Sequence, residues 1–210
     1  MAHKLTITRK DKFLEESVVV KLLDDFINES YSGKRLKKNG TRISKKTVRN
    51  YEYFKNVFLD FLEYSTFEFK IYIFNNLTQS QKEKAGNYHK KFYKKFTSYL
   101  YTKKKYFDNY VGFIVKLLRS FFNYLKLERN VDTGEYHRKF FVPVEDIQIV
   151  ALNSDQLRYI LSDEAFNDKL KENNLILVRD VFIFGCTVAL RVSDLLSLTK
   201  KNLLVQNVMA

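Results

Sequence analysis

The chain has 210 residues, with 37 Lys and Arg against 24 Asp and Glu, so its formal net charge at pH 7 is +13. A hydrophobic fraction of 45% is large enough for a buried core and excludes a disordered polyelectrolyte. The positive excess predicts a polyanionic partner, with nucleic acid first and an anionic membrane surface second. Net charge alone also allows a basic protein that has no such partner.

Few residues break or cross-link the chain. Its 6 Gly and 1 Pro favour long helices over many short strands. The single Cys186 excludes an intrachain disulfide and fits a reducing cytoplasm. It lies in the apolar run from Val181 to Leu190, where we expect a small core residue, and this run is too short to span a bilayer. Residues 1–12 contain no apolar stretch, so we expect no secretory signal.

Four helices are predicted in the first part of the chain. Apolar residues at three- and four-residue steps indicate helices over 13–32, from Ser44 to about Leu62, over 80–103 and over 107–129. Residues 66–80 fit either a short strand or a buried extended connector. The region of the third helix, from Lys82 to Lys105, has nine lysines and one acid, Glu83. Its interleaved aromatic residues are able to stack on a single strand, but their helical spacing favours packing in the core.

Two groups of basic residues are candidates for binding DNA. Lys45, Lys46 and Arg49 follow the predicted N-cap Ser44, so they lie in the first turns of a helix, where positive charge opposes the helix dipole. A phosphate contact offsets that cost, and simple solvation is the alternative. The second group consists of Lys116 and Arg119, beside the apolar face of the fourth predicted helix.

The composition changes after the fourth helix. A turn at 130–134 and the only proline, Pro143, predict a linker over 130–150 between a domain at 1–129 and a second one at 151–210. Asn153 and Gln156 form a predicted capping box at the start of a new helix. We expect a buried helix over about 175–188, a short amphipathic helix over 193–198 and the start of a strand over 203–209.

One segment of the second part resembles a known family. The run from Ala189 to Leu198, with the sequence ALRVSDLLSL, is similar to the first catalytic box of tyrosine recombinases, the phage-integrase family, with Ala189 in place of the usual glycine. The run from Ser44 to Tyr51 resembles the start of the DNA-facing helix in the family's core-binding domain. Residues 117–122 resemble its second DNA-facing helix. The order of these segments is most similar to integrases of mobile elements of the Bacteroides type.

The resemblance implies a mainly α fold, with a SAM-like four-helix core-binding bundle followed by a truncated α+β catalytic domain. It implies that Arg191 is a catalytic residue that holds the phosphate in the transition state and that Asp194 supports it. An arginine suits this role because a guanidinium offers two parallel donors to phosphate oxygens. A surface Arg before an amphipathic helix is the alternative. It implies double-stranded DNA as partner and no membrane, and the family requires no metal or other cofactor. We expect the full-length protein to be a tetramer on DNA and this chain to be a monomer or weak oligomer.

The family's remaining catalytic residues, a Lys, a His-x-x-Arg box, a further His or Trp and the nucleophilic Tyr, follow this box, and none of the chain's 14 tyrosines lies after Arg191. We therefore expect the chain to bind DNA but not to cut it. His3, His89 and His137 are isolated, so no metal site is predicted. Two alternatives stay open, namely a non-enzymatic helical DNA-binding protein and a protein that binds RNA or a membrane surface through the lysine-rich third helix.

Overall fold

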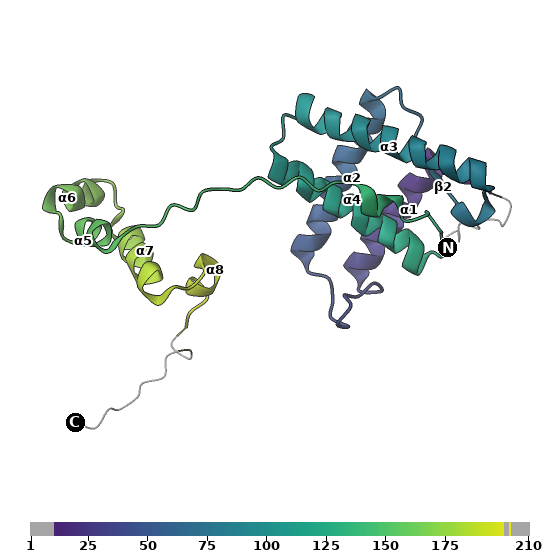
Figure 1. Ribbon diagram of the computed structural model, residues 1–210. Helices are drawn as coiled ribbons and strands as arrows, with labels where there is room; N and C mark the ends of the chain where they lie inside the picture. Colours follow the sequence, from purple (N-terminus) through teal and green to yellow (C-terminus); the bar gives the residue numbers. More distant parts are fainter. Residues whose placement is uncertain (1–10, 200–201, 203–210) are drawn as a thin grey trace. The chain divides into compact units, whose positions relative to one another are not determined.

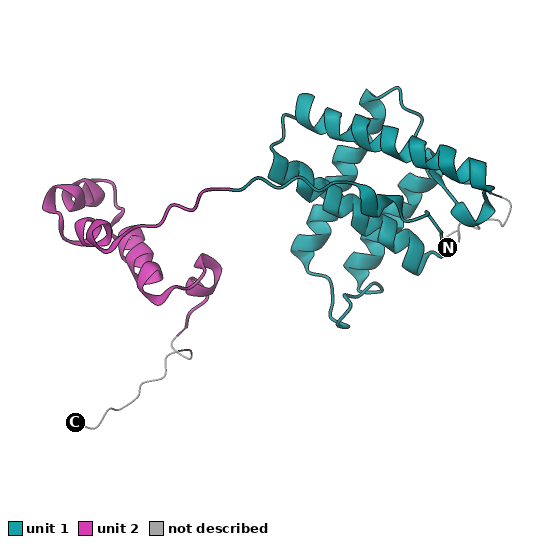
Figure 2. Cartoon of the chain, in the orientation of Figure 1, with its two compact units in different colours: residues 1–146 teal, residues 147–210 magenta. Residues whose placement is uncertain are grey.

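The computed structural model describes residues 11–199 and 202 and divides the chain into two compact units, residues 1–146 and 147–210 (Figure 2). The first unit is a bundle of α1 (Glu16–Ser32), α2 (Lys45–Tyr64), α3 (Gln79–Thr102) and α4 (Asp108–Glu128), with strands β1 (Phe13–Glu15) and β2 (Lys70–Tyr72) and the 3-10 helices η1 (Phe74–Asn76) and η2 (Tyr136–Lys139) (Figure 1). The second unit contains α5 (Ser154–Ser162), α6 (Glu164–Glu172), α7 (Ile176–Val188) and α8 (Val192–Leu195). The predicted mainly α fold is confirmed. None of the helices in the described part of the chain has the length and apolar character needed to cross a membrane.

Phenylalanine rings from all four helices form the core of the first unit. Phe58 and Phe61 of α2 meet Phe96 of α3 edge to face, with ring centroids 6.1 and 5.0 Å apart. Phe26 of α1 lies 5.8 Å from Phe121 of α4 in the same orientation. All five rings are at most 2% exposed, and edge-to-face pairs add to the stabilisation that burial provides. The predicted apolar stripes therefore do become the core.

The helix starts follow the chemistry of their capping residues. The Ser44 side chain accepts a hydrogen bond from the backbone N–H of Thr47 at 3.2 Å, so the predicted start of the second helix is confirmed. At the start of α3, Thr78 and Gln81 form a reciprocal capping box. These caps fix where each lysine-rich helix begins, and with it the faces that the lysines occupy.

The first predicted helix begins later than expected. Residues 13–15 form strand β1, which pairs antiparallel with β2 so that Leu14 lies opposite Ile71. Leu14 is buried whereas its two neighbours are exposed, which is the two-residue alternation of a strand. Including Phe13 and Leu14 in the helix was wrong, because two apolar residues at the end of a helical pattern fit either periodicity. The ambiguous residues 66–80 contain β2 and η1.

The first part of the predicted linker packs on the bundle. Val131, His137 and Phe140 are each at most 3% exposed. At Gly112 the chain crosses α4 so closely that a Cβ atom would lie 2.1 Å from the backbone oxygen of Pro143. Asn109 exchanges hydrogen bonds with the backbone of Glu145. The boundary between the units, after Asp146, therefore lies near the end of the range 130–150, because these apolar contacts hold the preceding residues to the first unit.

The second unit has well-formed helices and no buried residue among those described. Asn153 and Gln156 form the predicted capping box, with bonds of 2.9 and 3.0 Å. The expectation that the helix near 175–188 is buried was wrong, and so was the expectation that Cys186 lies in a core, because α7 has no buried residue and Cys186 is exposed within the described part of this unit. The short helix α8 ends at Leu195, earlier than predicted. The strand expected over 203–209 lies outside the described residues.

Two buried histidines join η2 to the bundle. His89 of α3 and His137 of η2 are at most 1% exposed. The ring of His89 stacks on Tyr136 at 5.5 Å, and neither of its nitrogens has a hydrogen-bond partner among the described residues. Burial lowers the pKa of both His89 and His137 to about 4, and protonation of His137 would lower the pKa of His89 further. Both histidines are therefore neutral at pH 7.

We expect the first unit to lose stability as the pH falls from 6.5 towards 4. An unfolded histidine has a pKa of about 6.5, so in this window the unfolded chain takes up a proton that folded His89 excludes. The free energy of unfolding should fall by about 2 kcal/mol between pH 7 and pH 5 from this residue. His89→Phe should remove this contribution, which urea unfolding of both proteins at the two pH values measures. An unchanged pH dependence in the variant would contradict it.

Candidate nucleic-acid interface

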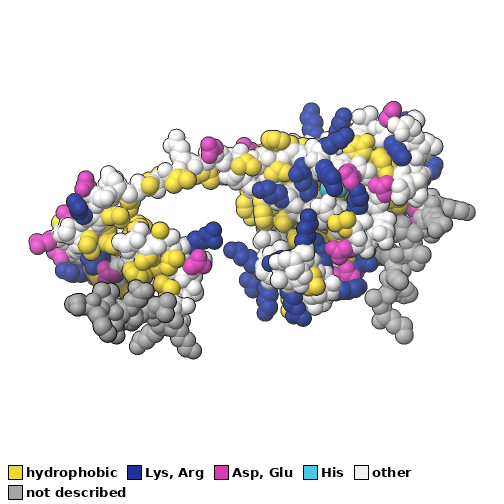
Figure 3. All heavy atoms as spheres, turned by 60° about the horizontal axis from the view of Figure 1, so that its bottom comes forward, with side chains coloured by type: hydrophobic (Ala, Val, Ile, Leu, Met, Phe, Trp, Pro, Cys, Tyr) yellow, Lys and Arg dark blue, Asp and Glu magenta, His cyan; other side chains and the backbone are white. Residues whose placement is uncertain are grey.

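The start of α2 presents three cations to solvent. Lys45, Lys46 and Arg49 are exposed, and the first turn of the helix contains no acidic residue. Among the described residues none of the three forms an ion pair. Figure 3 shows Lys and Arg side chains gathered on the face of the first unit that this view presents. These three cations keep their charge available for an external anion.

The loop before α2 adds further positive charge. Gly33 ends α1 in the left-handed conformation, with φ of 81°, which glycine adopts without steric cost. A bridge between Leu36 and Arg42 then closes a tight turn, in which the N–H of Lys37 donates to Thr41 at 2.9 Å. This turn exposes Lys37, and Lys38 next to it.

An ion-pair network anchors this loop to α1 and α4. The guanidinium of Arg35 donates to Glu128 at 2.8 Å and lies 4.5 Å from the ring centroid of Phe26. Arg129 contacts Glu29, which also accepts from the hydroxyl of Tyr124 at 2.9 Å. Burial raises the pKa of Glu29, but hydrogen bonds from Lys34 and Tyr124 outweigh burial and lower the pKa below its ordinary value. These charges belong to the fold and hold the base of the basic loop in place.

A groove of about 650 Å³ lies between the basic loop, α4 and η2. Lys37 and Lys38 of the loop line it together with Ser120 and Asn123 of α4 and Arg138 of η2. Thr47 and Tyr51 of α2 also line it. The tertiary fold thus joins the basic loop to polar side chains that lie over 70 residues away in the sequence. Sequence reasoning missed Ser120, Asn123 and Arg138, because no local pattern marks which face of α4 the loop approaches.

The structure separates the two candidates on α4. Lys116 is exposed and, in the described part of the chain, has no ion-pair partner. The guanidinium of Arg119 instead donates to three backbone oxygens, those of His137 at 3.0 Å, Arg138 at 2.7 Å and Phe140. Arg119 therefore lines the groove while its donors hold η2 on the bundle. The sequence contains no sign of this role, since backbone acceptors carry no residue signature.

The two candidate catalytic residues belong to the second unit. Ala189 ends α7 in the left-handed conformation with φ of 53°, the conformation that glycine favours. Arg191 follows in extended conformation as the N-cap of α8, and its backbone oxygen accepts from the N–H groups of Asp194 and Leu195 at 2.9 Å. Its side chain is exposed, and the ion pairs between described residues do not join it to Asp194. The carboxylate of Asp194 accepts from the Ser193 hydroxyl at 3.4 Å instead.

Within residues 11–199 and 202, no three His, Cys, Asp or Glu side chains come together as ligands for a metal ion. His3 lies outside this range. Comparison of the chain with family models, curated proteins and solved structures found no match.

The contacts of Arg119 predict a structural effect on mutation. Arg119→Ala leaves three carbonyl oxygens without their charged donor, so the free energy of unfolding should fall by about 2 kcal/mol or more. Arg119→Lys should not restore it, because lysine has a single ammonium nitrogen, whereas the planar guanidinium donates to these acceptors from two nitrogens. Lys116→Ala is the matched control on the same helix and should change stability by less than about 0.5 kcal/mol. Equal unfolding free energies for Arg119→Ala and Lys116→Ala would contradict this role.

Proposed function

We propose that the first unit binds double-stranded DNA through the start of α2, the basic loop before it and Lys116 of α4. We further propose that the chain is the DNA-binding portion of a site-specific tyrosine recombinase that integrates or excises a mobile element. In this proposal the bundle is the SAM-like core-binding domain, and the second unit begins the α+β catalytic domain. The observation that carries DNA binding is the group of exposed, unpaired cations at the N-terminus of α2.

This group of cations is unfavourable for the isolated protein. Three like charges lie in the first turns of a helix, where the dipole already favours anions, and each costs a few tenths of a kcal/mol, about 0.3 or more. Other lysines of the unit are paired, such as Lys34 with Glu29 and Lys104 with Asp60. The first unit therefore contains carboxylates that pair with other lysines, but among the described residues none forms an ion pair with Lys45 or Lys46. Phosphate groups of a nucleic-acid backbone supply the missing countercharge, and released counterions drive the association.

The geometry favours a duplex as the partner of this surface. Ser44 caps the helix that carries the cations, and Arg35 fixes the loop beside it, so both sets of charges have defined positions. Cations carried on a helix and a loop of defined backbone position are able to contact several phosphates of one duplex, and such phosphate contacts set the register of a protein on DNA. The polar groups of Ser120 and Asn123, which line the adjoining groove, add neutral donors and acceptors for the backbone.

The turn at Ala189 supports the recombinase part of the proposal. The family has a glycine at this position, and Ala189 adopts the left-handed conformation that a glycine there permits. The exposed Arg191 that follows has no side-chain partner among the described residues, so its guanidinium is available to two oxygens of one phosphate. A guanidinium held after such a turn is suited to stabilising the negative charge of a phosphoryl transition state.

Binding to a duplex should be strongly salt-dependent. If Lys45, Lys46, Arg49 and Lys116 each contact a phosphate, the logarithm of the association constant should fall with the logarithm of salt concentration with a slope of about −3 to −4. Replacing all four by Ala should remove most of this slope, as measured by fluorescence anisotropy of a labelled duplex. Lys169→Ala/Lys171→Ala, which changes two exposed lysines of α6, is the control. A slope near zero, or wild-type affinity in the fourfold variant, would refute the proposal.

Arg191→Ala should leave both the melting temperature and duplex affinity nearly unchanged, because its side chain is exposed and unpaired within the described structure. Thermal unfolding and anisotropy measure the two properties, and a large loss of stability would make Arg191 structural.

The coding DNA after the codon for Ala210 tests the recombinase part separately. We expect it to encode a His-x-x-Arg box and a Tyr, whereas a non-enzymatic DNA-binding protein requires neither.

A further inference from the structure

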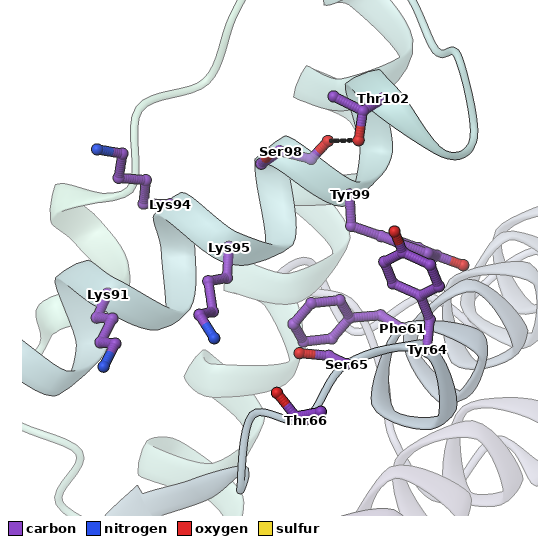
Figure 4. A pocket seen from close by; sticks show the side chains of 10 residues that line it. All are labelled: Phe61, Tyr64, Ser65, Thr66, Lys91, Lys94, Lys95, Ser98, Tyr99 and Thr102. Atoms are coloured by element: carbon purple, nitrogen blue, oxygen red, sulfur yellow. Dashed lines mark hydrogen bonds between the residues drawn. The ribbon is translucent and has the colours of Figure 1, made fainter.

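A second groove, of about 610 Å³, lies between the end of α2 and the middle of α3. Lys91, Lys94 and Lys95 line it from α3, the rings of Phe61 and Tyr99 form its apolar floor, and Tyr64 borders it (Figure 4). In Figure 4, Lys91 and Lys95 point to the same side of α3, whereas Lys94 points away from them. None of these residues lines the groove beside the basic loop. The surface is thus built from different residues than the proposed duplex site.

The charge of this groove is of one sign. Between Glu83 and Asp108 the sequence has eight lysines and no acid. Lys91, Lys94 and Lys95 are exposed, and the ion pairs between described residues include none of them. Lys84, Lys91 and Lys95 are seven and four residues apart, which places them along one face of α3. The positive charge therefore extends along the helix beyond the groove and is suited to a linear polyanion.

The groove also contains an exposed aromatic ring that packs against the core. Tyr64 is 59% exposed, although its ring lies only 5.2 Å from that of buried Tyr99. The ammonium of Lys103 lies 5.5 Å from the Tyr64 ring centroid, so an anion next to this ring meets a further cation. Aromatic rings beside lysines are the usual means of holding an unstacked base together with its phosphates.

We propose that this groove binds single-stranded nucleic acid, with one base stacked on Tyr64 and the backbone phosphates at Lys91 and Lys95. A base within a duplex is covered on both faces by its neighbours and is unable to stack on Tyr64. A free mononucleotide leaves the lysines outside the groove without a partner, whereas a strand that follows α3 uses them. The inference adds a second site to the unit and does not depend on duplex binding.

The test compares two sets of variants of the full chain on two ligands, a labelled oligothymidylate of about 12 nucleotides and a labelled duplex. Tyr64→Ala/Lys91→Ala/Lys95→Ala should lower affinity for the oligothymidylate by about tenfold or more and change duplex affinity less than about twofold. Lys45→Ala/Lys46→Ala/Arg49→Ala should do the reverse. Tyr64→Phe, which keeps the ring, should bind the oligothymidylate as the wild type does. The Lys169→Ala/Lys171→Ala control should bind both ligands normally.

A photochemical crosslink gives a second readout that identifies the residue. An oligonucleotide with 5-iodouracil should form an adduct on Tyr64, located by mass spectrometry, and the adduct should be lost in competition with oligothymidylate. Wild-type affinity in the Tyr64/Lys91/Lys95 variant, or equal loss of single-strand binding in the Lys45/Lys46/Arg49 variant, would overturn the inference. Displacement of the oligothymidylate by anionic phosphatidylserine vesicles but not by unlabelled single strands would also overturn it and assign the groove to a membrane surface.

Discussion

The aromatic packing between α2 and α3 determines which faces of these two helices point to solvent. Phe58 and Phe61 require one face of α2, and Phe92 and Phe96 require one face of α3, so the lysines between them must point outwards. The same packing holds Tyr99 in the core with Tyr64 against its outer side. A mutation that moved α3 relative to α2 would therefore change both the core and the second groove. The lysines of both proposed nucleic-acid surfaces on α2 and α3 therefore face solvent because the aromatic residues of these helices occupy the core.

The charged residues of this unit divide into two groups with different physics. Arg35, Arg119 and Arg129 direct their guanidinium groups at protein acceptors, and each connects elements that are distant in the sequence. The lysines that form no ion pair among the described residues include those at the start of α2, in the loop before it and on exposed helix faces. Arginine suits the first group because its planar fork reaches several acceptors at once. In this protein the arginines of α4 and of the loop base mainly hold the fold together.

The two units differ in how much apolar surface they bury. The first has a continuous core, whereas no described residue from 147 onwards is buried, although α7 is among the most apolar helices of the chain. Local interactions define the helix ends of the second unit, as in the capping box at Asn153 and the left-handed turn at Ala189, and the Arg179 guanidinium donates to Asn167 between α7 and α6. Gly185 contributes to this local order, because a Cβ atom there would lie 2.9 Å from the side chain of Leu195.

Sequence periodicity and capping chemistry predicted the four long helices of the first unit and the start of α5 well, because both act within four residues, whereas α6 was not predicted. The start of α2 at Ser44 and the start of α5 after Asn153 follow from single side chains that accept local N–H groups. The strand at residues 13–15 was missed because its pairing with Ile71 is a long-range interaction, and a three-residue strand has too few residues to reveal a period of two. The packing of residues 131–142 on the bundle was also missed, because a turn-rich composition does not indicate which helices such a segment contacts.

For the candidate sites, the sequence by itself determined where the cations lie along the helices and that acids are absent near them. Only the tertiary structure decided which cations are free. Arg119 and Lys116 are three residues apart on one helix, yet one donates to carbonyl oxygens of η2 and the other faces solvent. That difference arises because hydrogen-bond acceptors on a backbone have the same chemistry at every residue, so only folding in three dimensions selects the ones that an arginine reaches.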